Sequence, residues 1–326
     1  MTRRVTNLTL LALTGGLVAS GLVAWILPEP TGAPLYLVHR VLGLALIGTL
    51  VAKYGIAGAS VRRRVRRGLS TSLVIGSLAA VALIVTIGLG VGWTFGLVSF
   101  DAPWSYSALN IHVLVGLALF LLVAIHSAVR WERRPPIARS ARRDAIRLAV
   151  GGVAAIALTA ILERFADERR ATGSKHAGSF NGNAFPLTIW NFDAIPAIDP
   201  AEWHLEVTGS VAAPNRVSYA DLLAMPSHEL VALIDSTGGW WSEQRWRGPR
   251  IGDLIAGARG TATSASVVSI TGHRWTFPLA ELNDAILATH VGGERLSAGH
   301  GAPARLVVPG RRGFQWIKWV SRIEVA

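Results

Sequence analysis

A Gly-rich turn followed by tryptophans marks one place in the chain where chemistry could occur. Residues 233–248 read Leu-Ile-Asp-Ser-Thr-Gly-Gly-Trp-Trp-Ser-Glu-Gln-Arg-Trp-Arg-Gly, at the end of an apolar run typical of a strand. Glycine accepts backbone angles that other residues resist, so Gly238 and Gly239 let main-chain amides approach a bound group. The same pattern is typical of a plain tight turn beside an aromatic cluster, and both interpretations stay open.

Two histidines lie near the starts of apolar stretches, and each is followed four residues later by a glycine. They are His39, with Gly43, and His112, with Gly116. On a helix the glycine lies on the same face one turn away, which leaves the clearance that a flat porphyrin needs. Because an ionisable group is costly to bury in lipid, we expect His39 and His112 to bind the iron of a haem b. The alternative is that hydrogen bonds to neighbouring helices satisfy both rings.

A third histidine, His126, follows His112 by fourteen residues. It faces the same way about 21 Å deeper, at 1.5 Å per residue. This spacing resembles two-haem cytochromes b, but the residue fourteen positions beyond His39 is Lys53. We therefore expect a single haem, with His126 near a quinone site or hydrogen-bonded to a neighbouring helix.

Two motifs near the C-terminus combine histidine, arginine, lysine and tryptophan. One is His300-Gly-Ala-Pro-Ala-Arg305, and the other contains Trp316-Ile317-Lys318. Together with residues 203–209 and 233–248, they resemble the molybdopterin-binding domain of the sulfite oxidase family, over roughly residues 180–326. That family includes the periplasmic catalytic subunit of the bacterial methionine-sulfoxide reductase system.

The resemblance implies a molybdopterin cofactor. His300 and Arg305 match a histidine and an arginine that contact the pterin in relatives. Trp316, Ile317 and Lys318 match a cofactor-binding tripeptide whose lysine interacts with the cofactor's phosphate. Arginine and lysine suit a phosphate because they donate charge-assisted hydrogen bonds. The alternative for Arg305 and Lys318 is ordinary surface charge.

Ser236 stands where the family has its molybdenum-ligating cysteine, and the chain contains no cysteine at all. Since a serine alkoxide can ligate molybdenum, we expect Ser236 to be the metal ligand and the catalytic residue. A hard oxygen ligand would change the redox potential relative to a thiolate. The opposite interpretation is a domain that keeps the fold but has lost the metal or its activity.

The tripeptide Trp190-Asn191-Phe192 falls where sulfite oxidases have Arg-Asn-His. Asn191 is kept, so the resemblance implies that it contacts the cofactor. A sulfite site needs positive charge to hold a dianion, and both cationic positions are lost here. We expect a small-molecule substrate other than sulfite, neutral or aromatic, at a mouth lined by Trp190, Trp240 and Trp241.

Five apolar stretches are long enough to span a lipid bilayer, which takes about 20 helical residues. They lie near 8–27, 35–57, 70–98, 107–129 and 145–162. The net charge of +12 arises entirely within residues 1–162, which hold 16 Lys or Arg against 4 Asp or Glu. These charges flank the apolar stretches, a pattern typical of cytoplasmic loops and not of a nucleic-acid-binding face. The loop charges predict a multi-pass protein of the cell membrane with its C-terminal domain on the periplasmic or extracellular side.

The sequence thus predicts an all-α transmembrane bundle, similar to a cytochrome b, followed by an α+β domain. We place the bundle at 1–162, a linker at 163–183 and the molybdopterin domain at 184–326. Within that domain we expect strands at 203–207, 230–234, 266–270 and 306–308, and helices at 219–224, 251–257 and 279–288.

The predicted function is a membrane-bound oxidoreductase that couples an extracytoplasmic molybdopterin site to a transmembrane haem b and the quinone pool. One alternative is a cofactor-poor, non-catalytic binding or sensor module on a haem-binding anchor, suggested by Ser236. Another is a haem-only quinone oxidoreductase whose outer domain is structural.

Overall fold

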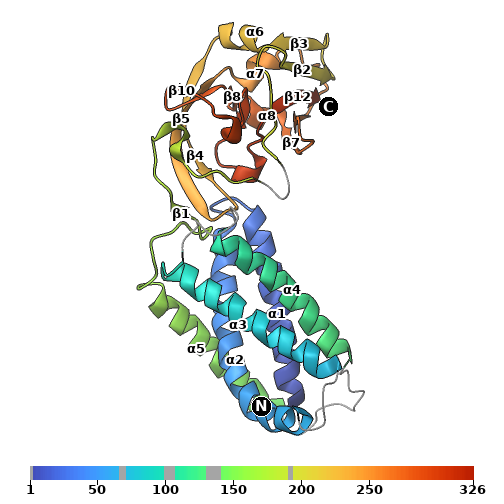
Figure 1. The fold of residues 1–326 in the computed structure, drawn as a ribbon, viewed down its shortest axis with the longest axis vertical. Helices are drawn as coiled ribbons and strands as arrows, with labels where there is room; N and C mark the ends of the chain where they lie inside the picture. The colour runs from blue at the N-terminus through green and yellow to red at the C-terminus, as the bar shows by residue number, and fades with distance from the viewer. Residues whose placement is uncertain (1–2, 66–70, 99–106, 130–140, 190–193) are drawn as a thin grey trace. The chain divides into compact units, whose positions relative to one another are not determined.

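The computed structural model describes residues 3–65, 71–98, 107–129, 141–189 and 194–326. The chain divides between Gly173 and Ser174 into two compact units, which we call the helical unit and the α+β unit (Figure 1). This division falls inside the stretch 163–183 that the sequence assigned to a linker. Residues 163–173 belong to the helical unit, and the rest of the stretch begins the α+β unit.

The helical unit contains five long helices. They are α1 (Arg3–Ile26), α2 (Ala33–Val65), α3 (Thr71–Thr94), α4 (Ala108–Val129) and α5 (Ala141–Leu162). All five are long and apolar enough to cross a membrane. They coincide with the five expected stretches, except that α2 runs to Val65, past the expected end at 57, and that the third stretch was expected to run to residue 98. Helix α3 ends earlier because Gly96 has a φ of +70° and the amide of Leu97 turns back to the carbonyl of Gly92.

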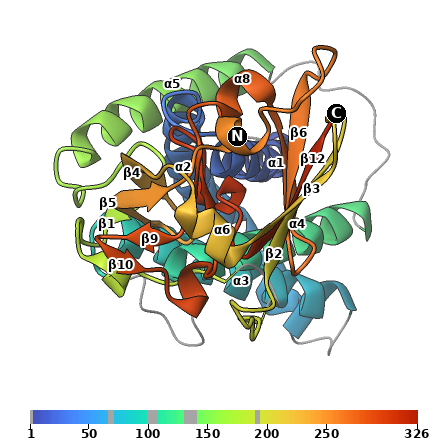
Figure 2. The ribbon, with the colours of Figure 1, turned by 90° about the horizontal axis from the view of Figure 1, so that it is seen from above.

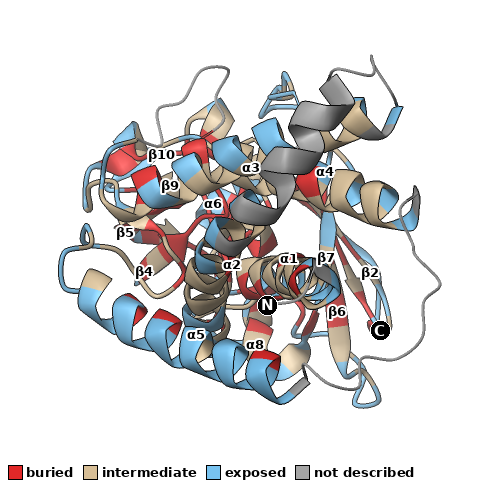
Figure 3. Ribbon diagram, turned by 90° about the horizontal axis from the view of Figure 1, so that it is seen from below, coloured by how far each residue is buried: buried red, intermediate tan, exposed pale blue. Residues whose placement is uncertain are grey.

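Helix α1 packs along α2, α3 packs along α4, and α5 packs against α2. Most residues of α5 are exposed, although its composition is apolar (Figure 3). Large apolar side chains such as Ile84 on α3 and Val153 on α5 are also exposed. Exposed apolar surface of this kind is typical of helices that face lipid.

The segment 163–173 is fixed to the helices by charged and polar contacts. Glu163 accepts from Arg169 and forms an ion pair with Arg40 on α2 at 2.9 Å. Further along the segment, Arg170 pairs with Glu29 in the α1–α2 connection. These ion pairs explain why a polar stretch, read as a linker from its composition, belongs to the helical unit.

The α+β unit is built from short strands and short helices. Its strands are β1 (Lys175–His176), β2 (His204–Gly209), β3 (Asn215–Ser218), β4 (His228–Asp235), β5 (Trp240–Gly248), β6 (Ser264–Ser269), β7 (Arg274–Pro278), β8 (Ile286–Ala288), β9 (His290–Val291), β10 (Glu294–Arg295), β11 (Arg305–Val307) and β12 (Val320–Val325). Its helices are α6 (Tyr219–Ala224), α7 (Ile251–Leu254) and α8 (Leu279–Leu282), with 3-10 turns at Gly182–Ala184, Ala298–His300 and Gly313–Gln315. The expected α+β class is therefore confirmed.

The strands form two five-stranded sheets and one smaller pair. One sheet has the order β3-β2-β12-β6-β7, and the other has β1-β5-β9-β10 with β4 also paired to β5. These two sheets lie on opposite sides of the unit (Figure 2). Strands β8 and β11 pair antiparallel. Leu205, Val267 and Ile323 from the first sheet pack with Leu287 and Leu306 from the β8–β11 pair in one apolar core.

Two expected elements differ from the structure. The helix expected at 279–288 ends at Leu282, and Ile286–Ala288 is strand β8. All three residues of β8 are buried, so this part is a continuous apolar run with no polar helix face. Similarly, the helix expected at 251–257 covers only Ile251–Leu254.

Candidate functional site

The stretch 233–248 forms a β-hairpin made of the end of β4, a four-residue turn and β5. The turn is closed by the amide of Ser236, which donates to the carbonyl of Trp240 at 2.8 Å, and by Gly239, whose φ is +87°. Strand β5 then alternates buried and more exposed residues, with Trp240 and Trp246 among the buried ones. The tryptophan cluster therefore belongs to a strand, which the sequence reading did not assign.

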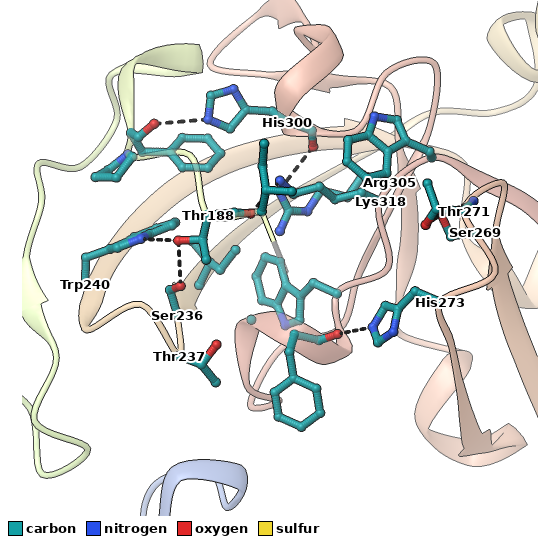
Figure 4. Close-up of a pocket in the computed structure, with 18 residues that line it drawn as sticks. Thr188, Ser236, Thr237, Trp240, Ser269, Thr271, His273, His300, Arg305 and Lys318 are labelled. Carbon is teal, nitrogen blue, oxygen red and sulfur yellow. Dashed lines mark hydrogen bonds between the residues drawn. The ribbon is translucent and has the colours of Figure 1, made fainter. Parts of the chain in front are cut away.

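Five of the expected site residues line one pocket: Ser236, His300, Arg305, Trp316 and Lys318 (Figure 4). The pocket encloses about 650 Å³ of space free of atoms, part of it open to solvent. It is formed by the β4–β5 turn, the 3-10 turn at Ala298–His300, the start of β11 and the segment before β12. These elements are far apart in sequence, so only the fold brings the motifs together.

Two other residues expected to contact the cofactor, Ile317 and Asn191, are not among the residues that line the pocket in the described structure. Ile317 is fully buried in the apolar core and does not line the pocket. Asn191, with Trp190, lies outside the described residues, so its predicted role stays a prediction. Of the other tryptophans expected at the mouth, Trp240 lines the pocket, whereas Trp241 stacks on His176 with ring centroids 4.4 Å apart.

Several lining residues were not predicted. Phe185 and Thr188 come from the stretch after the first 3-10 turn, and Ser269, Thr271 and His273 come from the β6–β7 turn (Figure 4). The only sequence signal for the second group is a short polar turn between two apolar runs. Such turns are common, although loops at strand ends often carry binding residues.

Arg305 places a guanidinium in the pocket wall with almost no solvent contact. It is 2% exposed, and its Nη1 donates to the carbonyl of His300 at 3.1 Å. Its Nε is buried and has no hydrogen-bond partner among the residues that the structure describes. Burial lowers the pKa of Arg305 to about 9. Among the described residues that line the pocket, none is Asp or Glu, so these residues supply no carboxylate for this cation.

His300 uses both ring nitrogens within the protein. Its Nε2 bonds to the carbonyl of Phe185 at 3.0 Å and must donate there, so its Nδ1 accepts from the hydroxyl of Ser297 at 2.7 Å. Burial, with a smaller effect from Arg305, lowers the pKa of His300 to about 4. The ring is therefore neutral near pH 7. In this arrangement His300 holds Phe185 in the pocket wall, and its predicted contact with a cofactor is not tested.

Lys318 also lines the pocket, close to Arg305. Its Nζ donates to the carbonyls of Thr188 at 2.9 Å and Gly299 at 2.8 Å. The next residue, Trp319, has a φ of +50°, which is strained for a side chain of this size. A hydrogen bond from its indole to the carbonyl of Ala298 at 2.7 Å holds it there. Strain of this kind clusters at functional sites.

Ser236 is 4% exposed and points its hydroxyl at the pocket. The amide of Gly238 donates to Ser236 Oγ at 3.0 Å, and Thr188 Oγ1 lies 3.2 Å from the same oxygen. Behind the turn, buried Arg312 pairs with Asp235 and donates to the carbonyl of Ser236 at 3.3 Å. Separating this ion pair would leave a buried charge without a partner. The pair therefore holds the main chain at Ser236 in one position.

The helical unit brings His39 of α2 and His112 of α4 together. Their ring centroids are 6.1 Å apart, with an angle of 73° between the rings. Each Nδ1 hydrogen-bonds to a main-chain carbonyl, that of Leu17 for His39 at 3.0 Å and that of Thr86 for His112 at 2.9 Å. These bonds fix the ring orientations and leave each Nε2 for another partner.

His126 and Lys53 have separate surroundings. The ring of His126 lies against Gly76 of α3, where an added Cβ would approach Cε1 at 3.2 Å. The amine of Lys53 donates to the side chain of Asn7 on α1. Lys53 therefore has a partner of its own on a neighbouring helix.

The second unit is thus a mixed α+β domain whose pocket presents a buried arginine, a half-buried lysine and a serine on a tight turn. Residues 192–326 match the family described as the oxidoreductase molybdopterin binding domain. The α+β unit is accordingly similar to the molybdopterin-binding oxidoreductase domain of sulfite oxidase and MsrP. The match begins at residue 192, so it assigns no family to the helical unit.

Individual relatives match between 40% and 55% of the chain. Rat mitochondrial sulfite oxidase is 29% identical over 165 residues, which are 40% of this chain and 30% of the relative. The MsrP catalytic subunit of protein-methionine-sulfoxide reductase from Gluconobacter oxydans (strain 621H) is 28% identical over 218 residues, 55% of this chain and 68% of the relative. The crystal structure of the sulfane dehydrogenase SoxCD from Paracoccus pantotrophus matches 40% of each chain, with 25% identity and a TM-score of 0.39. The chain spans less than a third of the length of the sulfite oxidases that it matches.

Proposed function

We propose that this chain is a membrane-bound oxidoreductase in which a molybdopterin in the α+β unit exchanges electrons with a haem b in the helical unit, and through it with quinone. The observation that carries the proposal is Arg305, a buried cation with an orphaned Nε in a pocket whose described lining residues include no carboxylate. A buried charge is expensive unless an opposite charge compensates it. An anionic cofactor supplies that charge.

The pocket residues fit a molybdopterin. Arg305 and Lys318 offer charge-assisted donors to its phosphate. Ser236, on the turn fixed by Arg312, offers an oxygen ligand to the metal at the family's ligand position. When bound, the cofactor supplies the oxidation–reduction chemistry at the substrate.

The histidine pair fits a haem b. Two imidazoles bound through Nε2 to one iron at about 2 Å each would hold their ring centroids roughly 6 Å apart. The observed separation of 6.1 Å agrees with this value. A metal-bound histidine usually donates its other ring nitrogen to a carbonyl or carboxylate, as His39 does to Leu17 and His112 does to Thr86.

The positively charged loops support the orientation of the chain in the lipid bilayer. The Lys and Arg residues that flank the five spans lie at Arg3, Arg4, 62–67 and 130–147. The connections 28–34 and 99–107 contain no Lys or Arg. With the N-terminus inside, five spans place the α+β unit outside the cytoplasm. Quinone, which dissolves in the bilayer, is the partner proposed for the haem.

The substrate that we propose is a small molecule other than sulfite. The basis is Trp190 and Phe192, which replace the cationic residues at the positions where sulfite oxidases have Arg and His. The pocket wall at Ser269, Thr271 and His273 offers hydrogen-bonding groups.

A second candidate function is a non-catalytic binding or sensor module on a haem-binding anchor. The observation that favours it is Ser236 itself, which stands in place of the metal-ligating cysteine of the family. A third candidate, a haem-only quinone oxidoreductase, would keep the α+β unit for structure alone.

Metal and haem analysis of the full chain, purified from molybdate-replete cells, separates these functions. Our proposal predicts one molybdenum, one pterin and one haem b per chain. A non-catalytic module or a haem-only enzyme predicts haem without molybdenum, and that result would defeat the proposal. Protein from cells grown with tungstate is the control, because it should keep the pterin and the haem but lose molybdenum.

A further inference from the structure

Thr188 lies between three groups of the pocket, although no sequence motif indicated it. Its hydroxyl is 3.2 Å from Ser236 Oγ and accepts from the indole of Trp240 at 2.7 Å (Figure 4). Its carbonyl accepts from the amine of Lys318 at 2.9 Å. One residue thus connects the proposed metal ligand with the proposed phosphate-binding lysine.

The donors and acceptors around Thr188 fix the direction of these hydrogen bonds. An indole N–H only donates, so Thr188 Oγ1 accepts from Trp240. The Thr188 hydroxyl therefore has its own hydrogen to give, and Ser236 Oγ is within reach. Ser236 Oγ also accepts from the amide of Gly238 at 3.0 Å. Two donors can therefore point at this oxygen, as suits an oxygen that has lost its proton.

The local fold makes room for this contact. A Cβ added to Gly238 would lie 2.8 Å from Thr188 Oγ1 and 3.2 Å from Trp240 Nε1. Real Cβ atoms do not come as close as the first of these distances, so a larger residue at 238 would displace Thr188 or Trp240. The hydroxyl contact thus requires a glycine at position 238.

We propose that Thr188 is a positioning residue for Ser236, to which it donates a hydrogen bond when Ser236 Oγ binds molybdenum. The inference rests on the proposed function. Before metal binding the Ser236 hydroxyl donates to Thr188. On binding, the Ser236 proton leaves to solvent, the oxygen–metal bond forms, and the Thr188 hydroxyl turns to donate to Ser236 Oγ. Trp240 keeps Thr188 in place in both states.

The consequence is a measurable effect on the metal. A hydrogen bond to a ligand withdraws electron density from it and favours the reduced metal, which raises the reduction potential. Thr188→Val keeps the shape of the side chain and removes the hydroxyl. It should lower the molybdenum potential and reduce turnover by about tenfold or more, the usual effect of losing such a partner. Thr188→Ser restores the hydroxyl and should behave as wild type.

The test uses full-length protein from molybdate-replete cells, with molybdenum and pterin content measured first and the molybdenum potential second. Thr188→Val should keep its pterin, because Arg305 and Lys318 are intact, and show a lower potential. In a Ser236→Ala background the same substitution should add no shift, because the accepting oxygen is gone. Trp240→Phe, which removes the donor to Thr188, should shift the potential in the same direction by less.

The outcomes separate the two claims. Wild type without molybdenum overturns the proposed function, and this inference with it. Wild type with molybdenum, but an unchanged potential in Thr188→Val, overturns the inference alone. So does a shift of equal size in the Ser236→Ala background, since it would mean that Thr188 acts on the cofactor by another route.

Discussion

The guanidinium of Arg305 lies in a wall where nearly every neighbour is neutral. Among the described residues, its partners are the carbonyl of His300 and the face of Trp246, whose ring centroid is 5.6 Å from Arg305 Cζ. Neither compensates a full charge, and burial lowers the pKa of this group to about 9. At the scale of single residues, this cation has no counter-charge among the described pocket residues, and we propose that a ligand supplies it.

Replacing this residue should empty the site. Arg305→Gln removes the charge and keeps a hydrogen-bond donor, so we expect purified protein to lose nearly all pterin and molybdenum while its haem content is unchanged. The pterin content is measured by its fluorescence after oxidation, and the molybdenum content by metal analysis. Arg311→Gln is the matched control, because Arg311 pairs with Glu281 and does not line the pocket. Full pterin content in Arg305→Gln would refute the role assigned to this cation.

His300 should make the stability of the α+β unit depend on pH. Its pKa is lowered from 6.5 to about 4 in the folded state, so between these values the unfolded chain binds more protons than the folded one. Stability is then full above about pH 6.5 and falls as the pH drops towards 4, by up to roughly 3 kcal/mol. The midpoint of urea unfolding, measured across this range, checks it. His300→Gln should flatten the dependence, and an equally steep profile in that variant would assign the effect to other groups.

At the scale of elements, the sequence indicates the long helices better than the short strands. Each transmembrane stretch is a long apolar run, and length alone identifies it. Strand β5 is harder, because its buried face contains Ser242 and Gln244 beside the tryptophans. Both side chains have a partner outside the strand, because Ser242 donates to the carbonyl of Gly178 at 2.7 Å and Gln244 Nε2 donates to the side chain of Asn181. The contact between Ser242 and Gly178 cannot be predicted from the sequence near Ser242, because the two residues are far apart in the chain.

The same limit applies to the pocket. Ser236, Arg305 and Lys318 could be predicted because they stand in motifs that resemble a known family. Thr188 and His273 could not, because their places depend on how distant segments pack. Composition misled at 163–173, where polar residues form ion pairs with the helical unit instead of a free linker. Elements that depend on long-range contacts are not visible in local sequence.

The helix pair α2 and α4 should hold one haem b. We expect His39→Ala and His112→Ala each to abolish the reduced-minus-oxidised haem spectrum, because each removes one of two axial ligands. His126→Ala should retain most of the absorbance. Equal loss in all three variants would contradict the assignment.

A glycine on α3 provides a finer test of the same site. An added Cβ at Gly90 would lie 3.1 Å from His112 Cε1, so Gly90→Ala should push the ring and alter the haem spectrum. Overpacking of this kind typically costs about 1–3 kcal/mol. Gly88→Ala on the same helix is the control, because nothing lies within 4 Å of its added Cβ. A spectrum that changes equally in both variants would mean that the effect is not due to His112.

At the scale of the whole molecule, charge and hydropathy divide the chain in two. Residues 1–162 carry the entire excess of positive charge, and residues 163–326 are balanced with 16 Lys or Arg and 16 Asp or Glu. The imbalance in the first part fits loops retained in the cytoplasm. It also leaves the α+β unit without a net charge that would favour nucleic acid.

The orientation can be tested with reporters. An enzyme active only outside the cytoplasm should be active when fused after Ala326 and silent when inserted within residues 62–67. The physical reason is that the arginines of 62–67 resist translocation. Activity at 62–67 with silence at Ala326 would reverse the proposed topology.

The central claim is that the two cofactors exchange electrons within one chain, and flash photoreduction of the haem tests it without knowledge of the substrate. After a brief flash reduces the haem, we predict that it reoxidises in a first-order phase whose rate does not depend on protein concentration, as the electron moves to molybdenum. Arg305→Gln, which should lack the molybdenum cofactor, should lose this phase while keeping the haem. A haem that stays reduced in wild type containing molybdenum, or a phase that persists in Arg305→Gln, would contradict the account.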